Sequence, residues 1–416
     1  MKWEVEKAKN QQLTLKINDY YVYSKYRPYE DAEKFINSNT NTESDYFVLL
    51  GLGLGYHLAA LKKLVPSNKI SVLLLDKNEQ EFYLKYCDRS LINDIKLITI
   101  TEISNIEKHE NIQFLVPISI INSLDSTHEL KEIFDEVKLN EMSYRLVADR
   151  MSDNFIHNIS LNNLFIKNLK GLFTGQTACL VSSGPSIDEM MPYLKQNQNK
   201  VFILSVSSAV RILEKYNIQP HATVLSDAKE RVQLQFKELS YQGPLFYLAT
   251  ACKEVLANYI GKKYILFQKG YDRSEQYAAQ LEEPTFDVGG SVAILGFLLL
   301  EYLGFERIVL CGQDLGFRQG KTHSIHTTSG MHISDYYKYG EVEANNGEKI
   351  NISKSLKIYH NWFENKIKKS NIEVYNTAYL GAKIKGAPYI DLKKFNQLIL
   401  ENDSEILQKK LGVFET

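Results

Sequence analysis

The sequence predicts an α/β protein made of two Rossmann-like parallel-sheet domains, joined by a helical connector and followed by a short helical C-terminal part. Short apolar runs alternate with helical stretches, the pattern of parallel strands covered by helices. Glycine-rich turns follow two of these runs directly, near Gly53 and Gly184, as they do in nucleotide-binding folds. With 416 residues, the chain is also too long for one ordinary core, so more than one domain is expected.

The composition excludes several classes of protein. The net charge is −1, so bulk electrostatics gives no reason to expect binding to nucleic acid or to a membrane surface. The four cysteines lie far apart and have neither metal-binding nor disulfide spacing, which suits a reducing compartment. The first residues lack the apolar segment of a signal peptide, and the longest apolar stretch, Ser291 to Gly304, is too short to span a bilayer. We therefore expect a cytoplasmic protein without membrane insertion.

The first predicted domain covers residues 1–125. It contains a strand, a turn and a helix between Phe47 and Leu64, followed by a strand from Ser71 to Asp76. The glycines of the turn resemble those that open a nucleotide-binding fold, at Gly51, Gly53 and Gly55. Such a turn could hold a dinucleotide or S-adenosylmethionine. The alternative is that the glycines only allow tight packing of the strand against the helix.

A helical connector is expected over residues 126–170, a central domain over 171–390 and a C-terminal tail over 391–416. From Thr177 onward, six apolar runs read as strands: TACLVSS, VFILSVSS, HATVLSDA, PLFYLAT, KYILFQKG and RIVLCGQD. Because crossovers between parallel strands are right-handed, the loops after these strands gather at one edge of the sheet. Ligands bind at that edge in open α/β sheets.

Small, polar and acidic residues stand where these strands end. The candidate site residues are Ser182, Ser183, Gly184, Pro185, Ser186, Ser207, Ser208, Asp227, Gly290, Ser291, Gln313, Asp314 and His323. Helices are expected to begin at Ser186, with Glu189 completing a capping box, and at Ser291. Backbone N–H groups at such helix starts favour a phosphate group. Neither start carries the Gly-Lys-Ser/Thr ending of a P-loop, so P-loop chemistry is excluded.

Several of these motifs together resemble one known family. VSSGPSID, SVSSAVRILEKYNIQP, GGSVAILGFLLLEYLG and CGQDLGFRQGKTHS look like the core of the Maf (motility accessory factor) flagellin glycosyltransferases, and GLGLGYHL resembles their N-terminal domain. The resemblance implies a catalytic domain similar to bacterial sialyltransferases and to hydroxymethylpterin pyrophosphokinase. The chain departs from the family at His221, where an acid is usual. It also departs in the loop from Asn376 to Pro388, which keeps Gly381 and Gly386 but lacks the acidic residue and the second glycine of the family's motif.

The resemblance implies transfer of a nonulosonic acid, of the pseudaminic or legionaminic type, from its CMP-activated form to Ser or Thr of flagellin. In that reaction the two helix starts would hold phosphate and carboxylate groups, and Asp227 or Asp314 would stabilise the cationic sugar. His323 would act as the general base. The structural alternative is that Asp314 and Gln313 only hydrogen-bond the turn after their strand. No cofactor or metal is required by this chemistry.

Other functions remain open at the level of the sequence. The same chemistry could serve another surface glycan as acceptor. A pterin pyrophosphokinase would transfer phosphate from ATP with Mg²⁺ held by Asp227 and Asp314. A non-catalytic nucleotide-binding role and a metal site at His323, His326 and His332 are further alternatives. The sequence leaves the donor sugar, the acceptor residue and the oligomeric state open.

Overall fold

The computed structural model describes residues 1–99, 102, 112–125, 128, 130–131, 148–317, 323–324, 327 and 340–415. The chain divides into two compact units, residues 1–139 and 140–416, and each is considered by itself below. Each unit contains a parallel sheet, so the predicted α/β class is confirmed. The finer division into domains, connector and tail stays a prediction. Within the described ranges, no helix is both long and apolar enough to cross a membrane.

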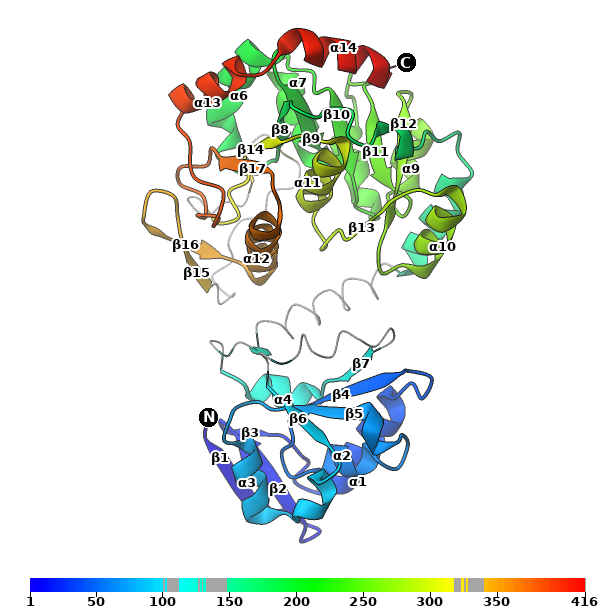
Figure 1. The fold of residues 1–416 in the computed structure, drawn as a ribbon, viewed down its shortest axis with the longest axis vertical. Helices are drawn as coiled ribbons and strands as arrows, with labels where there is room; N and C mark the ends of the chain where they lie inside the picture. The colour runs from blue at the N-terminus through cyan, green and yellow to red at the C-terminus, as the bar shows by residue number, and fades with distance from the viewer. Residues whose placement is uncertain are drawn as a thin grey trace. The chain divides into compact units, whose positions relative to one another are not determined.

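Unit 1 is built on a four-stranded parallel sheet in the order β6-β5-β4-β7, beside a three-stranded antiparallel sheet in the order β1-β2-β3 (Figure 1). The sequence did not predict the antiparallel sheet, because its strands are short, polar and partly exposed. The strands are β1 (Trp3–Lys7), β2 (Leu13–Ile17), β3 (Tyr20–Tyr21), β4 (Tyr46–Leu50), β5 (Ile70–Leu73), β6 (Lys96–Ile98) and β7 (Ile112–Leu115). The helices are α1 (Pro28–Asn39), α2 (Tyr56–Leu61), α3 (Glu79–Tyr86) and α4 (Ile118–Ser123).

Unit 2 is built on an eight-stranded sheet in the order β13-β12-β11-β10-β9-β8-β14-β17, with all neighbouring pairs parallel. All six predicted strands are present, and β13 and β17 extend the sheet at its two edges. The strands are β8 (Thr177–Val181), β9 (Phe202–Val206), β10 (Ala222–Leu225), β11 (Leu245–Leu248), β12 (Lys263–Gln268), β13 (Thr285–Phe286), β14 (Arg307–Cys311) and β17 (Glu373–Asn376). A separate hairpin pairs β15 (Gly340–Glu343) with β16 (Lys349–Ile352).

The helices of unit 2 cover both faces of this sheet, as right-handed crossovers require. They are α6 (Ile187–Asn197), α7 (Val210–Lys215), α8 (Gln233–Phe236), α9 (Lys253–Asn258), α10 (Asp272–Leu281), α11 (Val292–Leu303), α12 (Lys354–Lys369), α13 (Leu392–Leu400) and α14 (Ser404–Glu415). The apolar α11 packs across β8, β9 and β10. Gly296 lets it lie close to the sheet, because a Cβ there would stand 2.7 Å from Leu180. Phe297 of α11 meets Trp362 and Phe363 of α12 edge to face.

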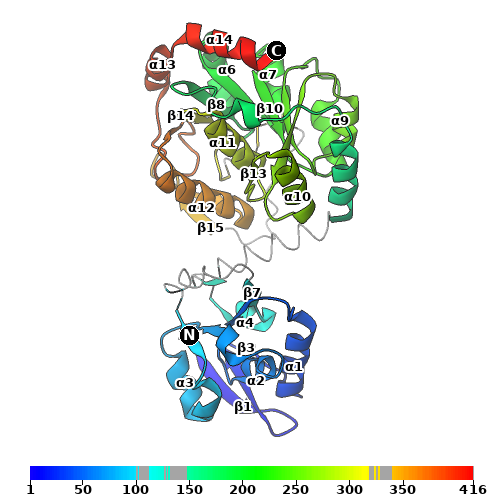
Figure 2. The ribbon, with the colours of Figure 1, turned by 45° about the vertical axis from the view of Figure 1, so that its right-hand side comes forward.

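The last two helices belong to the core of unit 2. Figures 1 and 2 both show α13 and α14 beside α6 and α7, and α13 contacts α6 directly. Phe395, Ile399 and Leu407 from these helices are fully buried in the main apolar cluster. Their burial explains why short amphipathic helices at this end of the chain are stable, since isolated helices of this length are marginal in water.

The glycine-rich turn of unit 1 is filled by a side chain of the same unit. The carboxylate of Glu79 accepts hydrogen bonds from the N–H groups of Leu52 at 2.7 Å, Gly53 at 2.9 Å and Leu75 at 2.6 Å. Gly53 has a positive φ of 53°, which a side chain would strain. The arrangement favours the packing explanation of the glycines, because a ligand anion would have to displace Glu79 from these amides.

Glu79 is completely buried, and that burial raises the pKa of its carboxyl group to about 7, against the opposing effect of the three N–H donors. A folded-state pKa above the unfolded value means that the folded protein binds the proton more tightly. The contribution of Glu79 to stability is therefore fully present below pH 4.5 and is lost as the pH rises through about 7.

We predict that raising the pH destabilises unit 1 of the wild type relative to unit 1 of the Glu79→Gln variant. The free energy of unfolding of the wild type should fall, relative to the variant, by roughly 3 kcal/mol between pH 4 and pH 8. The chain has two tryptophans, Trp3 and Trp362, so fluorescence in a Trp362→Phe background follows unit 1 alone during urea unfolding. The exposed Glu81 on the same helix gives the control, since Glu81→Gln should change nothing with pH. A difference that stays flat between pH 4 and pH 8 would contradict the prediction.

Candidate functional site

The chain reverses direction across the eight-stranded sheet at β8. The strands from β8 to β13 are added in one direction, whereas β14 pairs with the other side of β8. The loops after β8 and β14 therefore meet at the switch point of the sheet, the position at which open α/β sheets bind ligands. Two groups of candidate residues, 182–186 and 313–314, stand at this point. The sequence predicted ligand binding anywhere along the carboxyl edge of the sheet. The topology narrows this region to the switch point between β8 and β14.

A buried carboxylate joins the two loops at this switch point. Asp314, only 3% exposed, accepts the backbone N–H of Ser186 at 3.1 Å and its hydroxyl at 2.7 Å. The predicted capping box with Glu189 is therefore wrong, because Ser186 makes no capping bond within its helix. The amide of Ser186, the residue just before α6, donates instead to a carboxylate that follows another strand, and a negative charge is favourable at this end of a helix. The Asp314 carboxylate therefore holds the turn after β8 and not only the turn after its own strand, as the structural alternative had it. A role for Asp314 in charge stabilisation stays a prediction.

The two loops approach each other so closely that Gly184 has no room for a side chain. Its N–H donates to the carbonyl of Gly312 at 2.9 Å. A Cβ on Gly184 would overlap both that carbonyl and the carboxylate of Asp314. Gly312 has a positive φ of 71° and equally lacks space beside Ser182. The amides predicted to bind phosphate, at Gly184 and Ser186, already donate to acceptors of the protein.

Hydroxyl groups from the loops after β8 and β9 form the next layer of the edge. The Ser182 hydroxyl donates to the side-chain carbonyl of Gln313 at 2.6 Å. The hydroxyls of Ser183 and Ser208 lie 2.8 Å apart, which links the loop after β8 to the loop after β9. Ser207 is buried, whereas Ser208 is partly exposed. Ser183 and Ser208 are therefore close together. One hydroxyl donates to the other, and the accepting hydroxyl keeps its proton for a ligand.

Asp227 differs from Asp314 in its environment. It follows β10, and its side chain is exposed at the same edge of the sheet. One carboxylate oxygen accepts the N–H of Lys229 at 2.9 Å, and the backbone carbonyl accepts the N–H of Cys252 at 3.0 Å. The second contact ties the loop after β10 to the loop after β11. Of the two predicted catalytic acids, Asp227 is the one that solvent and a ligand can reach.

The residue after His323, Ser324, makes contacts at this edge that the sequence analysis did not predict. The N–H of Ser324 donates to the carbonyl of Ser183 at 2.8 Å, and its hydroxyl donates to Asp188 of α6 at 2.9 Å. These bonds fasten the His323 segment to the first turn of α6. Burial lowers the pKa of His323 below its ordinary value of 6.5. The partners His326 and His332 of the metal alternative lie outside the described residues.

The second predicted helix start lies on the same edge but outside this bonded cluster. α11 begins after Ser291, whose N–H donates to Val288. Gly289 and Gly290 both have positive φ angles, of 50° and 77°, which turn the chain sharply into the helix. The carbonyl of Gly290 accepts the hydroxyl of Tyr359 of α12 at 3.0 Å.

The two departures from the Maf pattern occupy different places. His221 precedes β10, at the amino edge of the sheet, where its Nδ1 accepts the N–H of Ile203 at 3.0 Å. It is therefore remote from the carboxyl edge. The loop from Asn376 to Pro388 packs onto Asp314 instead, because the N–H of Ala382 donates to the Asp314 carbonyl at 2.7 Å. Only the second departure touches the candidate site.

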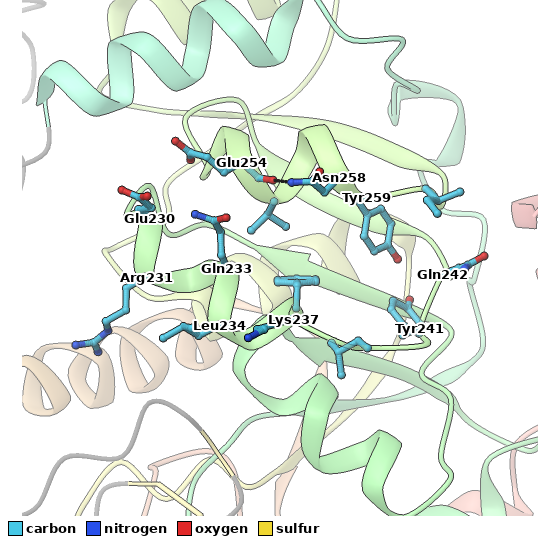
Figure 3. A pocket seen from close by; sticks show the side chains of 14 residues that line it. Glu230, Arg231, Gln233, Leu234, Lys237, Tyr241, Gln242, Glu254, Asn258 and Tyr259 are labelled. Carbon is cyan, nitrogen blue, oxygen red and sulfur yellow. Dashed lines mark hydrogen bonds between the residues drawn. The ribbon is translucent and has the colours of Figure 1, made fainter.

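A shallow groove of about 650 Å³ begins near Asp227. Figure 3 shows charged side chains at one end, Glu230, Arg231 and Glu254, and Tyr241, Gln242 and Tyr259 at the other. The charged end belongs to the loops after β10 and β11, whereas the aromatic end precedes β11 and β12. The groove therefore runs along the sheet from its carboxyl edge toward its amino edge, between α8 and α9.

We predict that Gly184→Ala destabilises unit 2 by about 2 kcal/mol or more, because overpacking forces apart the turn that Asp314 holds. Urea unfolding in a Trp3→Phe background follows unit 2 through Trp362. Gly412→Ala in α14 is the matched control, since a Cβ on Gly412 would meet no atom within 4 Å and alanine favours a helix. The control should be neutral or stabilising. Equal stability of Gly184→Ala and the wild type would mean that the two loops can separate at little cost.

Three comparisons with known proteins bear on this chain. A family model described as "6-hydroxymethylpterin diphosphokinase MptE-like" matches residues 153–320, which include most of the candidate site. A solved structure described as a Maf glycosyltransferase from Magnetospirillum magneticum AMB-1 aligns with a TM-score of 0.54 and 15% identity. The alignment covers 99% of this chain and 76% of that one. No curated protein matches.

These findings confirm the resemblance predicted from the motifs at the level of fold. At 15% identity the structural likeness concerns the fold and not the reaction. The chain therefore has the fold of a Maf glycosyltransferase over nearly its whole length, with an MptE-like region at 153–320 around the switch point of its larger sheet.

Proposed function

We propose that this protein is a glycosyltransferase that moves a nonulosonic acid, of the pseudaminic or legionaminic type, from a CMP-activated donor to Ser or Thr of flagellin. Two findings support the proposal: the shared fold with a Maf glycosyltransferase and the matching motifs of the sequence. The observation that carries it is the exposed carboxylate of Asp227 on the same carboxyl edge as the Ser183–Ser208 hydroxyl pair.

Each group at this edge has a place in the proposed reaction. The bond between the sugar and the phosphate breaks with its electron pair going to the phosphate, which leaves a cationic sugar. The Ser183–Ser208 pair would donate its remaining hydroxyl proton to the phosphate, and the carboxylate of Asp227 would stabilise the positive charge on the sugar. The acceptor hydroxyl oxygen then bonds to the sugar carbon, and His323 would take its proton.

A second candidate function has its own support. The family model that matches residues 153–320 carries the name of a pterin diphosphokinase. Such an enzyme transfers a diphosphate group from ATP and needs Mg²⁺ bridging the phosphates. The acids expected to hold that metal are Asp227 and Asp314, but Asp314 is buried against Ser186. Because one of the two carboxylates is committed to the turn, we favour the transferase.

We predict that Asp227→Asn lowers the rate of transfer at least about a hundredfold while CMP still binds, because only the charge on the sugar loses its stabiliser. Asp272→Asn is the matched control, since it makes the same change at an exposed carboxylate at the start of α10, outside the groove. The measurements are turnover of the CMP-activated donor and the rise in melting temperature with CMP. Turnover of ATP that EDTA abolishes, with no stabilisation by CMP, would overturn the transferase in favour of the pterin diphosphokinase.

We predict that the rate of transfer rises with pH around a midpoint below 6.5, because the neutral imidazole of His323 is the base and burial lowers its pKa. His323→Ala should remove this limb of the pH profile and leave the affinity for CMP unchanged. The profile of kcat against pH, measured for wild type and variant, checks it. An unchanged limb in the variant would assign the proton transfer to another group.

A further inference from the structure

Unit 1 contains a cavity of about 240 Å³ that the proposed function does not use. Its walls come from α1, the start of α2, the segment after β3 and the segment leading into α4. The glycine-rich turn nearby is closed by Glu79, so this cavity is a different opening. Its volume suits a ligand smaller than the usual 300–1,000 Å³ range of binding pockets.

Three rings line this cavity: Tyr23, Phe35 and His57. The centroid of the His57 ring lies 5.1 Å from that of Tyr23 and 5.5 Å from that of Phe35. The hydroxyl of Tyr23 accepts the N–H of Leu54, so its polar atom is already bonded within the protein. The rings therefore offer the cavity mainly aromatic surface.

Most of the polar groups around the cavity are also committed. The Ser119 hydroxyl donates to the carbonyl of Val22, and the Ser24 hydroxyl accepts the N–H of Tyr26. Two polar side chains, those of His57 and Asp31, can still interact with a ligand. His57, 4% exposed, has an Nδ1 atom without a hydrogen-bond partner. Asp31 has no ion pair among the described residues.

The charges around the cavity favour a cation. Among the described residues, Asp31 is the only Asp, Glu, Lys or Arg that lines it. Of the basic residues near the cavity, Arg27 pairs with Glu30 and Lys63 with Glu33. Lys34, on the same helix as Asp31, is exposed and does not line the cavity. Burial lowers the pKa of His57 to about 4, so its ring is neutral at pH 7 and does not repel a positive ligand. Aromatic faces together with one carboxylate form the arrangement that binds quaternary ammonium groups.

We propose that the cavity formed by Tyr23, Asp31, Phe35 and His57 binds a small organic ammonium ion. The carboxylate of Asp31 supplies the countercharge at the mouth, and the rings attract the cation through their electron-rich faces. The ligand brings the hydrogen-bonding group that His57 lacks inside the protein. The site is independent of the proposed transfer reaction and rests on unit 1 alone.

Choline and 3,3-dimethylbutan-1-ol test this proposal, because they share one shape and differ in charge at a single atom. The full-length chain with Trp362→Phe reports the unfolding of unit 1 through Trp3. Choline should raise the unfolding midpoint of unit 1, at ionic strength matched with sodium chloride. Its affinity by calorimetry should exceed that of the neutral alcohol by at least roughly tenfold.

Two variants and one control locate the effect. Asp31→Asn removes the countercharge, and Phe35→Leu removes a ring while keeping an apolar side chain of similar bulk. Each should reduce the preference for choline to about threefold or less, with unfolding of unit 1 in buffer alone as the test of folding. Glu30→Gln, next to Asp31 but outside the cavity, should keep the full preference. Equal affinity for the two probes, no binding of choline, or an unchanged preference in Asp31→Asn would each overturn the proposal.

Discussion

The hydrogen bonds between the carboxylate of Asp314 and Ser186 hold together the carboxyl edge of the larger sheet. They join the loop after β14 to the start of α6 across 128 residues of sequence. Gly184 and Gly312 provide the space that this contact needs, and Ala382 fastens the loop after β17 to the backbone of the same aspartate. The loops after β8, β14 and β17 therefore all meet at Asp314, and their positions relative to one another depend on its contacts.

Unit 1 contains the same kind of carboxylate-to-backbone contact, made by different residues. In both parallel sheets, a carboxylate of the protein itself accepts the N–H groups of the glycine-containing turn at the switch point: Glu79 in unit 1 and Asp314 in unit 2. Unpaired amides at such turns would be costly to bury, so an internal acceptor stabilises each turn without a ligand. The two turns that most resemble phosphate sites in the sequence are therefore satisfied from within.

Because these amides are already paired within the protein, other groups at the carboxyl edge are better candidates for contacting a ligand. Asp227 is exposed, the hydroxyls of Ser183 and Ser208 form a pair, and Ser324 with Asp188 fastens the segment of His323. The groove between α8 and α9 begins at Glu230, in the same loop as Asp227, and offers carboxamides and aromatic rings along the sheet. An enzyme with these groups would contact its ligand through hydroxyl donors and one accessible carboxylate more than through a cluster of unpaired backbone N–H groups. The proposed transfer from a CMP-activated sugar is compatible with that set.

The sequence by itself determined the α/β class, the six central strands of the larger sheet and the edge at which the polar residues gather. These features are local, since a run such as Thr177–Val181 is apolar throughout and is buried throughout. Only the tertiary structure decided which acid is buried and which is exposed, because Asp227 and Asp314 follow similar strands in the sequence. It also decided that Glu79 closes the turn at Gly53 and that β13 and β17 complete the sheet. Such pairings join residues far apart in the chain, and no local pattern specifies a partner at that distance.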